Sequence, residues 1–97
     1  MMVLITYDVN TTDASGKTRL RKIAKQCVNY GQRVQNSVFE CEVTPDQWVQ
    51  LKSALLSIYD SEEDSLRFYM LGKKGRNKVE HCGAKASVDT TRDALIF

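Results

Sequence analysis

Three segments of the chain carry apolar residues in the pattern of β-strands. Residues 2–9 (MVLITYDV) combine β-branched and aromatic side chains without Gly or Pro, which predicts a central strand buried on both faces. Residues 32–43 have a similar character, but polar residues 35–37 interrupt them, so a bend or bulge should divide them into two short strands. Residues 65–71 alternate apolar and polar side chains and predict a further strand.

The segment after the polar stretch 10–16 has the spacing of an amphipathic helix. Its apolar residues recur every three or four positions, with basic residues around them, and form one stripe: Leu20, Ile23, Ala24, Cys27 and Val28. This helix is expected to end near Tyr30–Gly31, because glycine readily adopts the left-handed conformation of a helix cap.

A second helix is predicted from Thr44 onward. Thr44, Pro45 and Gln47 have the order of a capping box with proline at the first helical position. Its buried face consists of Trp48, Leu51, Leu55, Ile58 and Tyr59. The order is thus strand, helix, two short strands, helix, strand. This is the βαββαβ pattern of a ferredoxin-like α+β sandwich, in which two helices cover one face of an antiparallel sheet.

Residues 72–97 are interpreted as a C-terminal dimerisation tail of a single domain, 1–97. They contain KVEHCG (78–83) and ALIF (94–97), two segments able to add strands. Apolar residues near a chain end favour docking over fraying into water. Strand exchange across a homodimer satisfies backbone hydrogen bonds and buries apolar side chains together. The alternative is that the tail folds back on its own domain.

Composition is that of an ordinary globular chain. A length of 97 residues with 42% hydrophobic content suits one modest core. No apolar stretch approaches the roughly 18 residues needed to span a bilayer, and the N-terminus lacks a secretory signal. We therefore expect a cytoplasmic protein without membrane association. Three cysteines without a CxxC pair disfavour a disulfide framework or a structural zinc site, and Cys27 and Cys41 are interpreted as buried thiols.

The net charge of +2 conceals an uneven distribution. Between residues 14 and 39 there is no Asp or Glu, but there are six cations: Lys17, Arg19, Arg21, Lys22, Lys25 and Arg33. A second basic cluster lies at 73–78, whereas acids gather between 40 and 64. A basic surface of this kind complements phosphate backbones, although a merely solvated face is the alternative. Tyr7 and Phe39 are candidates for stacking on bases, with core packing as their alternative role.

Asp8, which ends the first predicted strand, is the sharpest candidate for chemistry. A carboxylate there needs solvent, a counter-ion or a metal, so it either caps the following loop, pairs with an arginine or binds an ion. Mg²⁺ needs few protein ligands, and Asp8 from each of two subunits would supply a pair, with Asp13 as a weaker second ligand. There is no nucleophile motif, phosphate-binding glycine loop or HExxH pair, and the single histidine, His81, is interpreted as a surface or interface residue.

Several motifs resemble one known family. YDV (7–9), RLRK (19–22) and above all YGQRVQNSVFECEV (30–43) are similar to the small CRISPR-associated nuclease counted as the second Cas protein. SLRFYMLG (65–72) and VEHCGAK (79–85) extend the resemblance over nearly the whole chain. It implies a ferredoxin-like fold, a homodimer with crossed C-terminal strands, and work with the CRISPR integrase, the first Cas protein, in capturing spacers. It also implies metal-dependent cleavage of single-stranded RNA or double-stranded DNA.

The resemblance also implies roles for individual residues. Asp8 matches the metal ligand at the dimer interface, and four residues match positions near it: Tyr7, Arg33, Ser37 and Phe39. Arg19 and Arg21 are carried over only loosely, and Lys17 joins the predicted nucleic-acid-binding set as part of the basic segment.

The resulting hypothesis is a Mg²⁺-dependent endonuclease in which Mn²⁺ can substitute. The ion, held between Asp8 of each subunit, would polarise a phosphate and activate water. Basic residues would position the backbone without reading sequence. The general base would be metal-bound hydroxide or an Asp, with activity favoured at higher pH. The alternative from a different class is a non-catalytic DNA-binding scaffold that bridges the integrase subunits.

Overall fold

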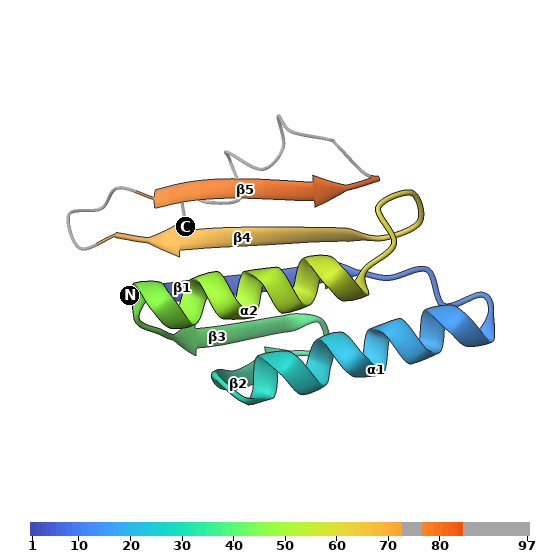
Figure 1. Ribbon diagram of the computed structural model, residues 1–97, viewed down its shortest axis with the longest axis horizontal. Coiled ribbons are helices and arrows are strands. Elements are labelled where there is room, and N and C mark those ends of the chain that lie inside the picture. The colour runs from blue at the N-terminus through green and yellow to red at the C-terminus, as the bar shows by residue number, and fades with distance from the viewer. Residues whose placement is uncertain (73–76, 85–97) are drawn as a thin grey trace.

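The computed structural model describes residues 1–72 and 77–84 as an alternation of strands and helices (Figure 1). The elements are β1 (Met2–Asp8), α1 (Ala14–Val28), β2 (Gly31–Gln35), β3 (Val38–Glu42), α2 (Pro45–Ile58), β4 (Ser65–Leu71) and β5 (Asn77–Gly83). The first six confirm the predicted βαββαβ order, including the division of 32–43 into two short strands, with a register shift in β2 between Arg33 and Gln35.

The strands within these residues form one sheet in the order β2-β3-β1-β4-β5, and every neighbouring pair is antiparallel. This order places β1 at the centre, as predicted. Both helices lie on the same side of the sheet in Figure 1. The predicted ferredoxin-like α+β sandwich is therefore confirmed, with β5 as an additional strand beside β4.

The first segment of the predicted tail pairs with its own domain. β5 runs antiparallel to β4 of the same chain, from Ser65 opposite Gly83 to Leu71 opposite Asn77. Residues 78–83 therefore fold back on their own sheet, which is the alternative to exchange. The second segment, 94–97, and the basic residues at 73–76 lie outside the described residues, so exchange of a C-terminal strand stays a prediction.

β1 is buried on one face only, which corrects the expectation that both faces are buried. Val3, Ile5 and Tyr7 point into the core beneath the helices, whereas the alternate side chains, Leu4 among them, are only partly buried. The reason is that successive side chains of a strand point to opposite faces, and the two helices cover only one of them. We call the uncovered side the open face of the sheet.

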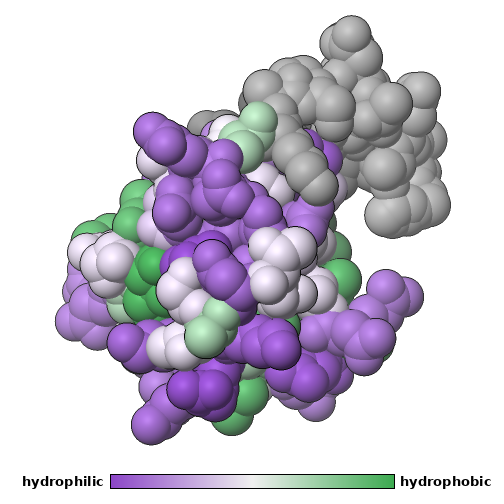
Figure 2. All heavy atoms as spheres, turned by 90° about the vertical axis from the view of Figure 1, so that its right-hand side faces the viewer, coloured by the Kyte–Doolittle hydropathy of each residue, from purple (hydrophilic) through white to green (hydrophobic). Residues whose placement is uncertain are grey.

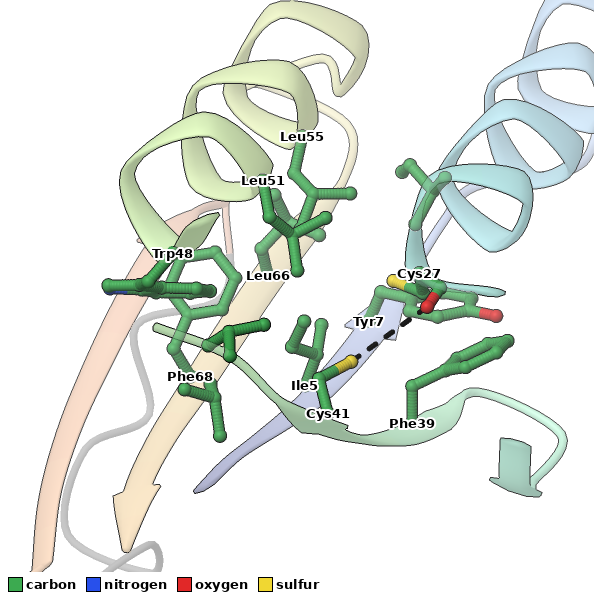
Figure 3. Close-up of a cluster of buried hydrophobic side chains, with 13 residues drawn as sticks. Ile5, Tyr7, Cys27, Phe39, Cys41, Trp48, Leu51, Leu55, Leu66 and Phe68 are labelled. Carbon is green, nitrogen blue, oxygen red and sulfur yellow. Dashed lines mark hydrogen bonds between the residues drawn. The ribbon is translucent and has the colours of Figure 1, made fainter. Parts of the chain in front are cut away.

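The core lies between the sheet and the two helices (Figure 3). Trp48 of α2 packs edge-on against Phe68 of β4, with ring centroids 4.9 Å apart. Cys27 and Cys41 are fully buried, as predicted, and the Cys41 thiol contacts the Cys27 carbonyl oxygen at 3.9 Å. Burial raises the pKa of Cys27 to about 12 and that of Cys41 to about 11, so both remain protonated thiols with little reactivity.

The two helices differ in how well their ends agree with prediction. The capping box at Thr44 is confirmed, because its hydroxyl accepts from the Gln47 backbone and the Gln47 side chain accepts from the Thr44 backbone. The predicted glycine cap of α1 is wrong: α1 ends at Val28 with a right-handed cap, and Gly31 begins β2. A Cβ on Gly31 would collide with the Glu40 carbonyl oxygen, so the close approach of β3 explains why a glycine stands at this position.

Neither helix in the described chain is long and apolar enough to cross a membrane.

α1 begins inside the stretch that was expected to be a loop. Asp13 is its N-cap, and its carboxylate accepts hydrogen bonds from the Gly16 backbone at 2.8 Å and the Ser15 hydroxyl at 2.9 Å. The loop passes close over this first turn. A Cβ on Gly16 would collide with the Asn10 carbonyl oxygen, so no side chain fits there without a backbone movement.

Replacing this glycine tests the contact between loop and helix. Gly→Ala within a helix ordinarily stabilises by about 0.5–1 kcal/mol. Gly16→Ala should instead lower the free energy of unfolding, measured by urea titration, because the backbone of Asn10 must move. Lys22→Ala on the exposed side of the same helix is the control and should have little effect. A more stable Gly16→Ala protein would contradict the described approach.

Candidate functional site

The candidate metal ligand, Asp8, is exposed at the end of the central strand. Its neighbour across the sheet is Ser65, the first residue of β4. Because strand side chains alternate and Tyr7 points toward the helices, Asp8 lies on the open face. Figure 2 faces the end of the molecule where β1 stops and α1 begins, and hydrophilic residues dominate it. The carboxylate therefore stands at a polar end of the sheet, where an ion can reach it.

A second carboxylate near this end, Asp64, is buried. Arg19 binds it with both sides of its guanidinium: Nε lies 2.7 Å from Oδ2 and Nη2 lies 3.2 Å from Oδ1. The backbone N–H groups of Asn10 and Asp60 donate to the same carboxylate at 3.0 and 2.9 Å. Asp64 thus joins the loop after β1, the first turns of α1 and the segment after α2.

The charge of Asp64 is stabilised despite its burial. Burial alone raises the pKa of the carboxyl group, but the hydrogen bond from Arg19 and those from the Asp60 and Asn10 backbones outweigh it and hold the pKa below its ordinary value. The Asp64 backbone carbonyl also accepts from Ala84 at 3.0 Å, and Gly83 has a φ of 113° where β5 passes it. Asp64 therefore fixes the end of the sheet at which Asp8 lies.

Sequence reasoning did not identify Asp64. It stands in an acid-rich run, DSEED, that looks solvent-exposed, and its arginine partner is 45 positions away. The available signal was its position immediately before the apolar alternation of the strand at 65–71.

A basic groove lies on the helix side of the same end of the sheet. It has a volume of about 410 Å³ between α1 and the turn from β2 to β3, and its lining residues are Tyr7, Lys17, Leu20, Arg21, Ala24, Arg33, Asn36 and Ser37. The structure thus brings five of the predicted nucleic-acid-binding residues together: Tyr7, Lys17, Arg21, Arg33 and Ser37. Their assignment to nucleic acid stays a prediction.

Tyr7, which lines this groove, is held by contacts with its neighbours. Tyr7 stacks on Phe39 with ring centroids 6.1 Å apart, and its hydroxyl donates to the Asn36 carbonyl at 3.4 Å. Burial, and then the proximity of Cys27, raise the pKa of Tyr7 against the opposing influence of Arg33. The Tyr7 hydroxyl therefore keeps its proton at neutral pH. The Arg33 guanidinium carbon lies 5.2 Å from the centre of the Phe39 ring, in a cation–π contact.

Two of the predicted nucleic-acid contacts have other roles in the structure. Phe39 is fully buried in the core, which favours the alternative role of core packing over stacking on a base. Arg19 does not line the groove, because its guanidinium is bound to Asp64. A phosphate contact by Arg19 stays a prediction that this geometry does not support.

The arrangement of carboxylates in the described residues shows how much of a metal site one chain can offer. No group of three or more His, Cys, Asp or Glu side chains among them is arranged to hold a metal ion. The Asp13 carboxylate caps α1 and Asp64 is held by Arg19, so both carboxylates already have partners within the chain, and Asp13 as a second ligand stays a prediction. An exposed carboxylate nevertheless fits Mg²⁺, which accepts one or two carboxylates with waters completing its shell. The residues of one chain therefore fit half of a shared site.

The fold and these features define a class: a small ferredoxin-like protein with an acid at the end of its central strand and a basic groove beneath α1. The family CRISPR associated protein Cas2 matches residues 1–79, and the chain belongs to that family. The resemblance drawn from the sequence motifs is confirmed.

Individual relatives are similar over most or all of the chain. A protein of Halalkalibacterium halodurans named CRISPR-associated endonuclease Cas2 is 60% identical over 97 residues, which is 100% of both chains. One of Nitratidesulfovibrio vulgaris named CRISPR-associated endoribonuclease Cas2 is 62% identical over 89 residues, covering 92% of this chain and 87% of the relative. The crystal structure of Streptococcus pyogenes Cas2 at pH 6.5 superposes with a TM-score of 0.71 at 63% identity, covering 75% of this chain and 88% of that one.

Removing the buried charge tests the Asp64 network. Asp64→Asn should lower the free energy of unfolding at pH 7 by on the order of 2–4 kcal/mol, because Arg19 loses its charged partner. Since the folded-state pKa of Asp64 is lowered, the stabilisation is complete above the unfolded pKa of about 3.9 and is lost as pH falls through the folded value. The difference from wild type should therefore shrink in acid.

Urea unfolding of both proteins between pH 3 and 7 measures this difference. Glu63→Gln is the matched control: it also removes one acid from the same run, but its exposed side chain can still accept from Asn10. Equal losses in the two variants, or a loss for Asp64→Asn that does not depend on pH, would contradict the role given to Asp64.

Proposed function

We propose that this protein is a metal-dependent endonuclease that hydrolyses phosphodiester bonds of double-stranded DNA, single-stranded RNA or both, in CRISPR spacer acquisition and antiviral defence. Its class, a CRISPR-associated nuclease, is that of its curated relatives. The metal, the substrates and the biological step are the proposal. The observation that carries it is the exposed carboxylate of Asp8 at the end of the central strand.

Asp8 would hold Mg²⁺, for which Mn²⁺ can substitute, with one carboxylate from each subunit of a homodimer. When bound, the ion supplies charge that polarises a phosphate oxygen and lowers the pKa of a coordinated water. Residues of the chain itself would position Asp8 and keep it accessible. The Asp64 network holds the strand end in place, and the open face leaves Asp8 accessible from the side opposite the helices.

A homodimer through the open face is the arrangement that this proposal needs. On that face, β1 presents partly buried side chains rather than charged ones, and only its last residue is an acid. Two copies packed with these faces together would cover apolar surface and direct each Asp8 toward the other. The tail beyond β5 would add to this contact by strand exchange.

The basic groove would position the nucleic-acid backbone. Lys17, Arg21 and Arg33 are cations around a recess with an apolar floor, so they offer phosphate contacts without base readout. The groove and Asp8 lie on opposite faces of the sheet at the same end. Binding in the groove is thus separable from chemistry at Asp8.

This separation favours a second candidate function, a non-catalytic scaffold that bridges DNA and the subunits of the CRISPR integrase in the cytoplasm. Its supporting observation is that the groove residues do not include Asp8. The two candidates differ in one respect: a scaffold retains its function when Asp8 is replaced, whereas a nuclease does not.

Replacing the candidate ligand tests the first function. Asp8→Asn should lower cleavage of single-stranded RNA and duplex DNA in Mg²⁺ or Mn²⁺ by about 100-fold or more, because several kcal/mol of charge stabilisation are lost. Asp13→Asn is the matched control, since Asn caps helices as well as Asp does. Cleavage by Asp8→Asn at the wild-type rate, with sedimentation and melting unchanged, would refute the catalytic role.

Charge removal in the groove tests nucleic-acid binding. The double variant Lys17→Gln/Arg21→Gln should weaken binding and reduce the slope of log Kd against log salt by about 0.7–0.9 for each phosphate that is no longer neutralised. Lys22→Gln/Lys25→Gln removes the same charge from exposed positions of the same helix that do not line the groove. If both double variants change the slope equally, binding follows the overall charge of α1 and the groove has no special part.

A further inference from the structure

Tyr7 lines the basic groove, but its polar atoms are directed to the turn between β2 and β3. The side chain is only 5% exposed, so it has little surface for a bound nucleic acid. Its backbone N–H donates to the Ser37 carbonyl at 3.1 Å, and its hydroxyl donates to the Asn36 carbonyl at 3.4 Å. Asn36 and Ser37 also line the groove. Tyr7 therefore fixes the wall of the groove that this turn forms.

Arg33, in the strand before this turn, rests on the same pair of aromatic rings. It is opposite Phe39 in the register of β2 and β3, and its guanidinium carbon lies 5.2 Å from the centre of the Phe39 ring. Tyr7 stacks on Phe39, and Figure 3 shows these two rings side by side. Arg33 opposes the rise in the pKa of Tyr7 through its charge and a hydrogen bond, which places the guanidinium beside the hydroxyl. Two neighbours thus hold this guanidinium.

The charge of Arg33 is available to a ligand. The ion pairs of the described residues do not include Arg33, its side chain is exposed, and no acid lines the groove. Because burial raises the pKa of Tyr7, its hydroxyl stays neutral at pH 7 and supports Arg33 without acting as a counter-ion. An arginine that is fixed but not neutralised is suited to bind one phosphate through two parallel hydrogen bonds.

We propose that Tyr7 is a positioning residue for nucleic-acid binding: its hydroxyl holds the Arg33 guanidinium in the orientation that binds a backbone phosphate. This inference rests on the proposed function, since it takes the groove as the binding surface. Lys17 and Arg21 enter the groove from α1 and would contact neighbouring phosphates. An arginine that is already oriented loses less conformational entropy on binding, so removal of its support costs affinity although every cation remains.

Substitutions at two positions separate the orientation of Arg33 from its charge. Tyr7→Phe removes only the hydroxyl and keeps the ring that stacks on Phe39. Arg33→Lys keeps the charge but lacks the planar group that packs on a ring and donates two parallel hydrogen bonds. Arg33→Gln removes the charge. Tyr59→Phe is the matched control, because it also removes one tyrosine hydroxyl, at the end of α2 and outside the groove.

Binding is measured in EDTA with a single-stranded RNA and a duplex DNA oligonucleotide of equal length, and the tighter ligand is used for all variants. Arg33→Gln should raise Kd about tenfold and reduce the slope of log Kd against log salt by about 0.7–0.9. Tyr7→Phe and Arg33→Lys should each raise Kd about threefold to tenfold with the slope unchanged. Tyr7→Phe should cause no further loss when added to Arg33→Gln, because the residue that Tyr7 holds is then absent.

Four results would overturn the inference. A wild-type Kd for Tyr7→Phe or Arg33→Lys would show that the charge of Arg33 suffices without its orientation. Additive losses in the Tyr7→Phe/Arg33→Gln double variant would show that Tyr7 does not act through Arg33. An unchanged salt slope for Arg33→Gln would show that Arg33 does not contact a phosphate. A loss for Tyr59→Phe equal to that for Tyr7→Phe would show that the place of the hydroxyl is unimportant.

These results are distinct from a failure of the proposed function. Because no cleavage takes place in EDTA, they do not depend on the result of the Asp8→Asn test. A wild-type Kd for both Arg33→Gln and Lys17→Gln/Arg21→Gln would refute the groove as the binding surface. A loss for Arg33→Gln without a loss for Tyr7→Phe would refute only the role given to Tyr7.

Discussion

The arrangement at the end of the sheet where Asp8 lies depends on the buried carboxylate of Asp64. Arg19 from α1, the backbone of Asn10 after β1 and the backbone of Asp60 after α2 all donate to it, and the chain after β5 binds its carbonyl. A buried carboxylate is costly unless such partners are complete, so Asp64 couples the stability of these segments. The position of Asp8, at the end of the strand that enters this network, follows from it.

Local patterns predicted most of the fold, because helices and strands follow from spacing within one segment. The βαββαβ order and the capping box at Thr44 are of this kind. What could not be predicted depends on contacts between distant segments. Arg19 and Arg21 looked equivalent in the basic stretch, yet two residues along a helix point in very different directions, so one meets Asp64 and the other lines the groove. The close approach of β3 requires a glycine at position 31. The spacing of residues along a helix does not reveal such a contact between strands.

The residues of the candidate site were predicted from the sequence, but their arrangement in space was not. Tyr7 and Asp8 are adjacent in sequence, which suggests one site, but adjacent residues of a strand face opposite sides of the sheet. Tyr7 therefore belongs to the groove beneath α1, and Asp8 to the open face. A nuclease and a DNA-bridging scaffold thus need not compete for the same surface, and a single fold can offer a binding side and a reacting side.

The open face explains why one chain by itself is a poor catalyst in this proposal. It presents a single candidate ligand at Asp8 and partly buried side chains along β1. A second copy would add a second carboxylate to the metal site and would cover the strand. In this proposal, cleavage depends on dimerisation. The fold holds Asp8 at the end of β1, and association brings the two Asp8 carboxylates together.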